Sequence, residues 1–172
     1  DAFPEYSRDE LHKSSTRAIA AFERTVLANQ SPFQLWLRGD TDAMSEKEIA
    51  GAEVFFGDGG CVACHQGAAF SSSVGATADQ VFFAVGFADL DFNEIIGGVS
   101  DPVRLGRGGF TQVEEDNYKF KVPQLYNLAD INVFGHGGSF SSVREVVEYK
   151  NIGIAQNDAS TDYLDPGFQP LG

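Results

Sequence analysis

The stretch GGCVACHQG, from Gly59 to Gly67, contains both cysteines of the 172-residue chain and one of its three histidines. On the first turn of a helix, residues i and i+3 share a face, so the thiols of Cys61 and Cys64 can reach one edge of the same ligand. His65 follows directly, and imidazole is a common metal ligand. Cys-x-x-Cys-His is the attachment signature of a c-type haem, in which the histidine binds the iron from the proximal side. The stretch therefore predicts one covalently bound haem c.

Other roles for these three side chains explain the pattern less completely. A zinc site needs four ligands and would have to recruit distant histidines. A thioredoxin-like dithiol is expected in a βαβ setting, which the sequence does not show. A disulfide across two intervening residues is strained, and it would leave His65 without a role. Haem attachment gives a role to both thiols and to the imidazole.

The overall composition is that of an acidic globular protein, with 42% hydrophobic and 22% charged residues. Its 12 basic residues against 25 acidic ones give a formal net charge of −13. Nucleic-acid binding requires clustered Lys and Arg, so the composition argues against it, and basic partners are expected instead. No apolar run approaches the roughly 20 residues of a membrane-spanning helix, and no signal peptide opens the chain. Export therefore has to be inferred from the haem chemistry.

Helix starts are marked by three Ser-x-x-Glu capping boxes. They are Ser7/Glu10, Ser45/Glu48 and Ser142/Glu145. The apolar spacing after them predicts helices over residues 9–28, from the second box to about 57, and over 143–149. A short helix is expected over 33–38.

Between residues 67 and 140 the chain is rich in Gly, Ser, Asp and Pro, and its apolar segments at 81–87 and 119–122 are short. This pattern predicts long ordered loops with minor β pieces. The expected fold is thus all-α, with a helical arm over residues 1–40 and a cytochrome-c-like haem domain over 41–172.

The second axial ligand stays open at this point. Methionine is a common partner of histidine in c-type cytochromes, but the only methionine, Met44, precedes the haem motif and a helix cap. His136, in FGHGGSF, is a candidate by residue type. Tyr149 and Lys150, at the end of the third capped helix, are the others, and an open site is the remaining possibility.

Several longer segments resemble, in order, the C-terminal half of bacterial di-haem cytochrome c peroxidases and the related MauG enzymes. They are RAIAAFERTVLANQSPFQLWLRGD, EIAGAEVFFGDGGCVACHQGAAF, the pair Gly106-Arg107, and YKFKVPQLYNLADINVFGHGGSFSSVREVVEYKNIG. The similarity runs from about Ala18 to Gly153. It implies a mostly helical, cytochrome-c-like domain in the periplasm.

In that family two haem domains work together. The N-terminal haem reacts with peroxide, while the C-terminal haem receives electrons from a small donor such as a cytochrome c or a cupredoxin. The resemblance implies that this chain is the second of these domains, with a second haem domain or haem-bearing chain as its partner. It is therefore expected to be incomplete or one piece of a larger assembly. The alternatives are a stand-alone mono-haem carrier or structural cytochrome subunit without catalysis, and an open-site domain that reacts with peroxide itself.

The resemblance also assigns residues. Cys61, Cys64 and His65 match the haem attachment, and His136 matches a histidine that lies near the haem. The family's distal ligand, Met or Tyr, lies fourteen positions after that histidine, where this chain has Lys150. Lysine binds iron only as the neutral amine, which burial and the charge of the metal would have to favour.

Two further assignments concern charged groups around the haem. Tyr126 stands where the family commonly has an arginine, so Arg107 and Lys121 become the candidates for binding the haem propionates. The family also holds a calcium ion through backbone carbonyls, and the matching positions here are Ile131 and Val133.

Overall fold

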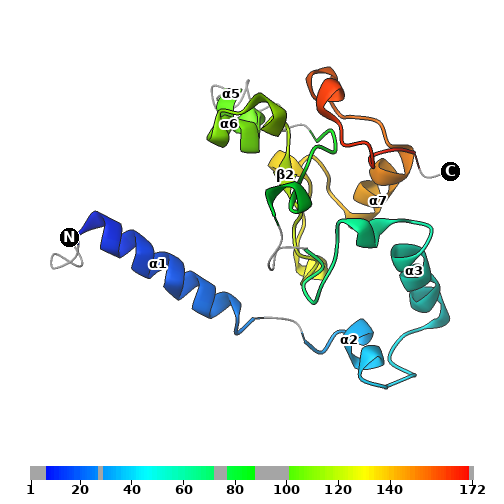
Figure 1. The fold of residues 1–172 in the computed structure, drawn as a ribbon. Helices are drawn as coiled ribbons and strands as arrows, with labels where there is room; N and C mark the ends of the chain where they lie inside the picture. The colour runs from blue at the N-terminus through cyan, green and yellow to red at the C-terminus, as the bar shows by residue number, and fades with distance from the viewer. Residues whose placement is uncertain (1–6, 27–28, 72–76, 88–100, 171–172) are drawn as a thin grey trace. The chain divides into compact units, whose positions relative to one another are not determined.

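The computed structural model describes residues 7–26, 29–71, 77–87 and 101–170 (Figure 1). The chain divides into two compact units, Asp1–Glu46 and Lys47–Gly172. The domain boundary expected between residues 40 and 41 falls inside the first unit and stays a prediction.

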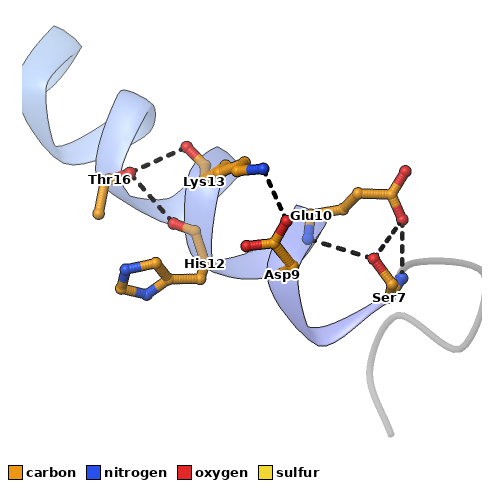
Figure 2. A network of polar contacts seen from close by, with 6 residues as sticks. All are labelled: Ser7, Asp9, Glu10, His12, Lys13 and Thr16. Atoms are coloured by element: carbon orange, nitrogen blue, oxygen red, sulfur yellow. Dashed lines mark hydrogen bonds and ion pairs between the residues drawn. The ribbon is translucent and has the colours of Figure 1, made fainter.

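The first unit contains the helix α1 (Arg8–Glu23), which starts at the expected capping box. The Oγ of Ser7 accepts from the backbone N–H of Glu10 at 3.3 Å, and the Glu10 carboxylate accepts from the Ser7 N–H at 2.9 Å (Figure 2). One turn later, Lys13 pairs with Asp9 at 2.6 Å. Local side-chain chemistry therefore sets the start of this helix.

Helix α1 ends earlier than the apolar pattern predicts, at Glu23 rather than near residue 28. The N–H and the hydroxyl of Thr25 both bond the Phe22 carbonyl, at 2.8 and 2.7 Å. The Val26 N–H likewise bonds the Glu23 carbonyl at 3.2 Å, so the chain leaves the α-helix through a tighter turn of i→i−3 bonds. The short helix α2 (Pro32–Leu37) follows, with proline in its first turn, where the missing N–H costs nothing.

The helix α3 (Glu46–Phe56) leads from the second capping box toward the cysteine motif. After it come the 3-10 turn η1 (Cys61–Ala63), the turn η2 (Ala78–Gln80), and the strand β1 (Phe82–Phe83). The helices α5 (Asp101–Arg104) and α6 (Arg107–Thr111) are short, as is the turn η3 (Glu114–Asp116). The strand β2 (Phe120–Lys121) pairs antiparallel with β1, with Phe82 opposite Lys121.

The turns η4 (Leu128–Asp130) and η5 (His136–Gly138) precede helix α7 (Val143–Ile152), and η6 (Asp158–Tyr163) follows it. The Oγ of Ser142 caps α7 by accepting from the N–H of Glu145 at 3.2 Å. Helices and turns joined by long loops, with one two-stranded sheet, make up the described residues. This agrees with the expected helical fold with minor β pieces.

The core of the second unit forms around Tyr149 on α7. Its ring lies 5.4 Å from Phe87, 5.1 Å from Phe140 and 5.5 Å from Phe168, measured between centroids. The segment after α7 returns to residues 84–87, where the Gln156 N–H donates to the Gly86 carbonyl at 2.8 Å. These contacts surround the last turn of α7, which carries Lys150.

Candidate haem site

The cysteine motif forms a helical turn of the 3-10 type, η1, where the sequence led us to expect the first turn of a helix. Gly60 enters the turn with φ +62°, and the His65 N–H closes it on the Cys61 carbonyl at 2.9 Å. In a 3-10 helix, residues i and i+3 eclipse one another. Cys61 and Cys64 therefore share one side of the turn, as haem attachment requires, and both are reduced and half-buried.

His65 is held by a hydrogen bond between its Nδ1 and the backbone carbonyl of Phe70, at 2.7 Å. A carbonyl only accepts, so Nδ1 carries the proton and the lone pair of Nε2 is left for a metal. Burial lowers the pKa of His65, with a further lowering by the charge of Lys150, while the bond to Phe70 acts in the opposite direction. The imidazole thus has the tautomer that a metal ligand needs.

The Phe70 carbonyl is aimed by an unusual backbone conformation. Phe70 has φ +52°, a left-handed geometry that costs a side-chain-bearing residue about 1 kcal/mol or more. Its N–H bonds the Gly67 carbonyl at 3.0 Å, and its ring packs edge-on against Phe55 at 5.6 Å. The Tyr126 hydroxyl donates to the Ala68 carbonyl at 2.7 Å and fixes the same loop.

Lys150, in the last turn of α7, places its Nζ among aromatic rings. The distances from Nζ to the ring centroids are 4.8 Å for Phe87, 5.0 Å for Phe168 and 5.8 Å for Tyr149. Burial lowers the pKa of Lys150 to about 8, against an opposing effect of Cys64 and Cys61. The structure therefore brings Lys150 within electrostatic range of the motif cysteines and of His65.

Tyr149, the neighbouring candidate ligand, is engaged elsewhere. Its hydroxyl donates to the Val85 carbonyl at 2.5 Å, and only 8% of the residue is exposed. Burial raises the pKa of Tyr149 to about 12, so the phenol keeps its proton at neutral pH. Its observed role is to anchor α7 in the core.

His136 lies on η5 with its ring against Phe120, at 4.0 Å between centroids and an interplanar angle of 30°. Met44 belongs to the first compact unit and is 8% exposed.

The two propionate candidates have contacts of their own. The Arg107 Nε donates to Asp116 at 2.9 Å, and its guanidinium lies 4.5 Å from the centroid of the Phe82 ring. The Lys121 Nζ donates to the Val122 carbonyl at 3.0 Å. Propionate binding by these residues stays a prediction.

Gly106, which precedes Arg107, has a steric requirement for glycine. It has φ +57°, and a Cβ there would lie 2.7 Å from the Lys119 carbonyl oxygen. Because position 106 is glycine, the backbone just before α6 can lie against Lys119, the residue just before β2.

Calcium binding also stays a prediction. Ile131 and Val133 are exposed, at 42% and 63%. In the part of the chain that the structure describes, no three His, Cys, Asp or Glu side chains cluster as metal ligands. This does not bear on a site made of backbone carbonyls.

The donor set fits a c-type haem. Cys61 and Cys64 would form the two thioethers, and the Nε2 of His65 would bind the iron. The Phe70 carbonyl and the Tyr126 hydroxyl were not predicted from the sequence. A backbone carbonyl leaves no side-chain signal, and the tyrosine could be recognised only as a departure from the arginine usual in the family.

Comparison with known proteins gives a consistent set of relatives, although no family model matches the chain. Cytochrome-c peroxidase IdrP1 of Denitromonas iodatirespirans is 31% identical over 170 residues, which covers 87% of this chain and 43% of that protein. Methylamine utilization protein MauG of Methylophilus methylotrophus is 32% identical over 152 residues, covering 86% of this chain and 39% of that protein. The chain thus spans about two fifths of the length of these curated relatives.

The fold comparison agrees. A solved structure described as a MauG-like protein associated with microbial copper homeostasis matches with a TM-score of 0.64 and 26% identity, covering 89% of this chain and 46% of that chain. The chain therefore belongs to the family of bacterial cytochrome c peroxidases and MauG and corresponds to the C-terminal part of its members.

Proposed function

We propose that this chain is a c-type haem electron-transfer domain, which relays electrons from a small donor to a peroxide-reducing haem in a partner domain. The observation that carries the proposal is the arrangement of Cys61, Cys64 and His65, with the Nδ1 of His65 bonded to the Phe70 carbonyl at 2.7 Å. When bound, the haem supplies a one-electron redox couple. The residues of the chain attach it, orient it and exclude water from it.

The two glutamates of α7 are not placed to act as a base in peroxide cleavage, which supports electron transfer as the role of this domain. Peroxide cleavage benefits from a general base placed near the reacting oxygen. The Glu145 carboxylate accepts from the N–H and the hydroxyl of Ser141 at 2.7 and 2.8 Å, and Glu148 pairs with Arg144 at 3.2 Å. Both glutamates are exposed, so neither is positioned as a base in a closed site.

The partners follow from the same proposal. Conversion of one hydrogen peroxide to two waters needs two electrons and two protons, so two single-electron deliveries must reach the partner haem. We place the donor, a small cytochrome c or a cupredoxin, and the domain itself in the periplasm. The peroxidase and MauG relatives support this assignment. Among the described residues, no helix is both long and apolar enough to cross a membrane.

The first test is covalent haem content. When the chain is made together with a haem c attachment system, we expect its mass to rise by one haem and a Soret band to appear. Replacing both Cys61 and Cys64 with Ser should abolish the covalent haem, and His65→Ala should remove the proximal ligand. His12→Ala, on the exposed face of α1, is the matched control and should keep the wild-type spectrum. A colourless wild-type protein of unmodified mass would refute the proposal.

The second test separates relay from catalysis. The reduced, haem-loaded chain should be oxidised slowly by hydrogen peroxide alone and quickly when a peroxide-reducing haem domain is added. Rapid turnover of peroxide by the chain alone would identify it as the peroxidase. If the full natural protein holds a single haem and purifies without a haem-bearing partner, the chain is a stand-alone carrier.

A further inference from the structure

We propose that the side-chain amine of Lys150 is the second axial ligand of the haem iron, paired with His65. This inference rests on the proposed function, because it assumes a haem at the cysteine motif. It is carried by the position of Nζ, which lies in a cage of aromatic rings and within electrostatic range of Cys61, Cys64 and His65.

The surroundings of Nζ do not suit a lysine that only carries charge. Lysine is almost never fully buried without a partner. Lys150 is partly buried, and no carboxylate of the described residues forms an ion pair with its Nζ. The rings of Phe87 and Phe168 offer only cation–π attraction, which compensates the loss of hydration incompletely. A partly buried amine in such a cage loses its proton more readily than an exposed lysine does, and a metal can then accept its lone pair.

Attachment of the haem would strengthen this preference. A thioether carries no charge and cannot ionise, so attachment leaves no thiolate beside Lys150 that could stabilise its ammonium form. The iron adds positive charge at the same place and disfavours the ammonium further.

The helix that carries Lys150 also presents an apolar flank. Val143, Val147 and Lys150 are spaced i, i+4 and i+7, so they share one face of α7. Val143 and Val147 are 42% and 61% exposed. A basic nitrogen beside exposed aliphatic side chains suits the face of a flat apolar ring with a metal at its centre.

One rival ligand, the phenol of Tyr149, is held by a hydrogen bond, and the other, His136, has its ring packed on an aromatic side chain. Tyr149 bonds the Val85 carbonyl and remains a phenol, while the His136 ring packs on Phe120. Ligation by two strong-field nitrogens would leave the iron six-coordinate, with no position open to peroxide. Such a site transfers electrons without catalysing peroxide cleavage.

The experiment is a comparison of haem-loaded variants by electron paramagnetic resonance and near-infrared magnetic circular dichroism. The wild-type ferric protein should be low-spin with the signature of histidine and amine ligation. Lys150→Ala should lose that signal, become high-spin or water-ligated, and bind added cyanide or imidazole much faster. Lys150→Met keeps an unbranched side chain of similar length, and it should show the charge-transfer band of a thioether ligand. Lys13→Ala is the control and should keep the wild-type spectrum, while Tyr149→Phe retains the ring beside Nζ and tests the phenol as the rival ligand.

The outcomes separate the two proposals. A Lys150→Ala protein that carries covalent haem and retains the wild-type spectrum overturns Lys150 ligation and leaves the proposed function standing. Loss of the signal in Tyr149→Phe, with Lys150→Ala unchanged, would assign the tyrosine instead. If Lys150→Ala fails to fold, Lys150→Met decides, because an unchanged amine signature in that variant also overturns the inference. A wild-type protein without covalent haem would refute the proposed function itself.

Discussion

At the scale of single residues, the site depends on a carbonyl group as much as on side chains. The tautomer of His65 is set by Phe70, whose left-handed backbone directs its carbonyl at Nδ1. Most non-glycine residues avoid this conformation because it is strained. Here the strained residue is the one whose carbonyl orients the His65 imidazole. The backbone of the chain therefore takes part in orienting the imidazole.

Glu145 gives a residue-scale prediction about pH. Its carboxylate accepts from the Ser141 N–H at 2.7 Å and from the Ser141 hydroxyl, and these bonds hold the pKa of Glu145 below its ordinary value. A carboxyl with a depressed folded-state pKa stabilises the fold above its unfolded-state pKa, and this contribution is lost as the pH falls through the folded value. Glu145→Gln should therefore flatten the acid side of the stability profile.

Denaturant unfolding of the haem-loaded protein at a series of acidic pH values measures this effect. Glu148→Gln is the control, since it removes a carboxylate from the same helix, and among the described residues that carboxylate bonds to Arg144. An acid profile that stays unchanged in Glu145→Gln would show that the bonds to Ser141 do not form in solution.

Individual residues also show what sequence reasoning can reach. Cys61, Cys64 and His65 were recognisable because their side chains and spacing carry the chemistry. Lys150 was recognisable by its distance from His136 in the family pattern, but its aromatic cage was not. The cage is formed by Phe87 and Phe168, which lie 63 residues before and 18 residues after the lysine.

At the scale of elements, α7 is the helix that positions the lysine, and both of its ends are specified by particular residues. Ser142 caps its start, and Gly153 ends it with φ +66°. A Cβ at Gly153 would lie 2.5 Å from the backbone nitrogen of Pro170. The C-terminal segment can approach the helix end this closely only because position 153 is glycine.

Gly153→Ala is therefore expected to destabilise the protein by more than the ~1 kcal/mol of left-handed strain alone. Gly51→Ala is the matched control, because Gly51 lies within α3 and a Cβ there meets nothing within 4 Å. It should raise the free energy of unfolding by up to about 1 kcal/mol through helix propensity. Thermal or denaturant unfolding of the two variants should give changes of opposite sign, and equal effects would contradict the role of Gly153.

Capping boxes predicted the starts of α1 and α7 because those signals are local. The end of α1 and the 3-10 form of the cysteine turn were not predicted. The end of α1 is marked by i→i−3 backbone bonds from Thr25 and Val26, and the cysteine turn is preceded by the left-handed Gly60. A helix predicted from apolar periodicity continues as long as the pattern does. The pattern contains no information about the backbone hydrogen bonds that end the helix or tighten a turn.

At the scale of the whole molecule, the chain is strongly acidic, and its homology reaches only the C-terminal part of longer proteins. A formal net charge of −13 is a property of the full 172 residues. Composition predicted this electrostatic character directly. It also bears on the proposed donor, because long-range attraction steers an oppositely charged protein toward the surface where electrons enter.

The proposed relay therefore predicts an electron-transfer rate that depends on salt and on the charge of the donor. With a basic cytochrome c as donor, the bimolecular rate of reduction of the haem-loaded chain should fall as ionic strength rises from about 0.01 M to about 1 M, since the Debye length shortens from about 30 Å to about 3 Å. An acidic donor of similar potential is the control, and its rate should rise over the same range because screening relieves repulsion. Stopped-flow measurement of both donors provides the comparison. If the two rates show the same salt dependence, net charge does not govern the encounter, and a local, uncharged docking contact must set the rate instead.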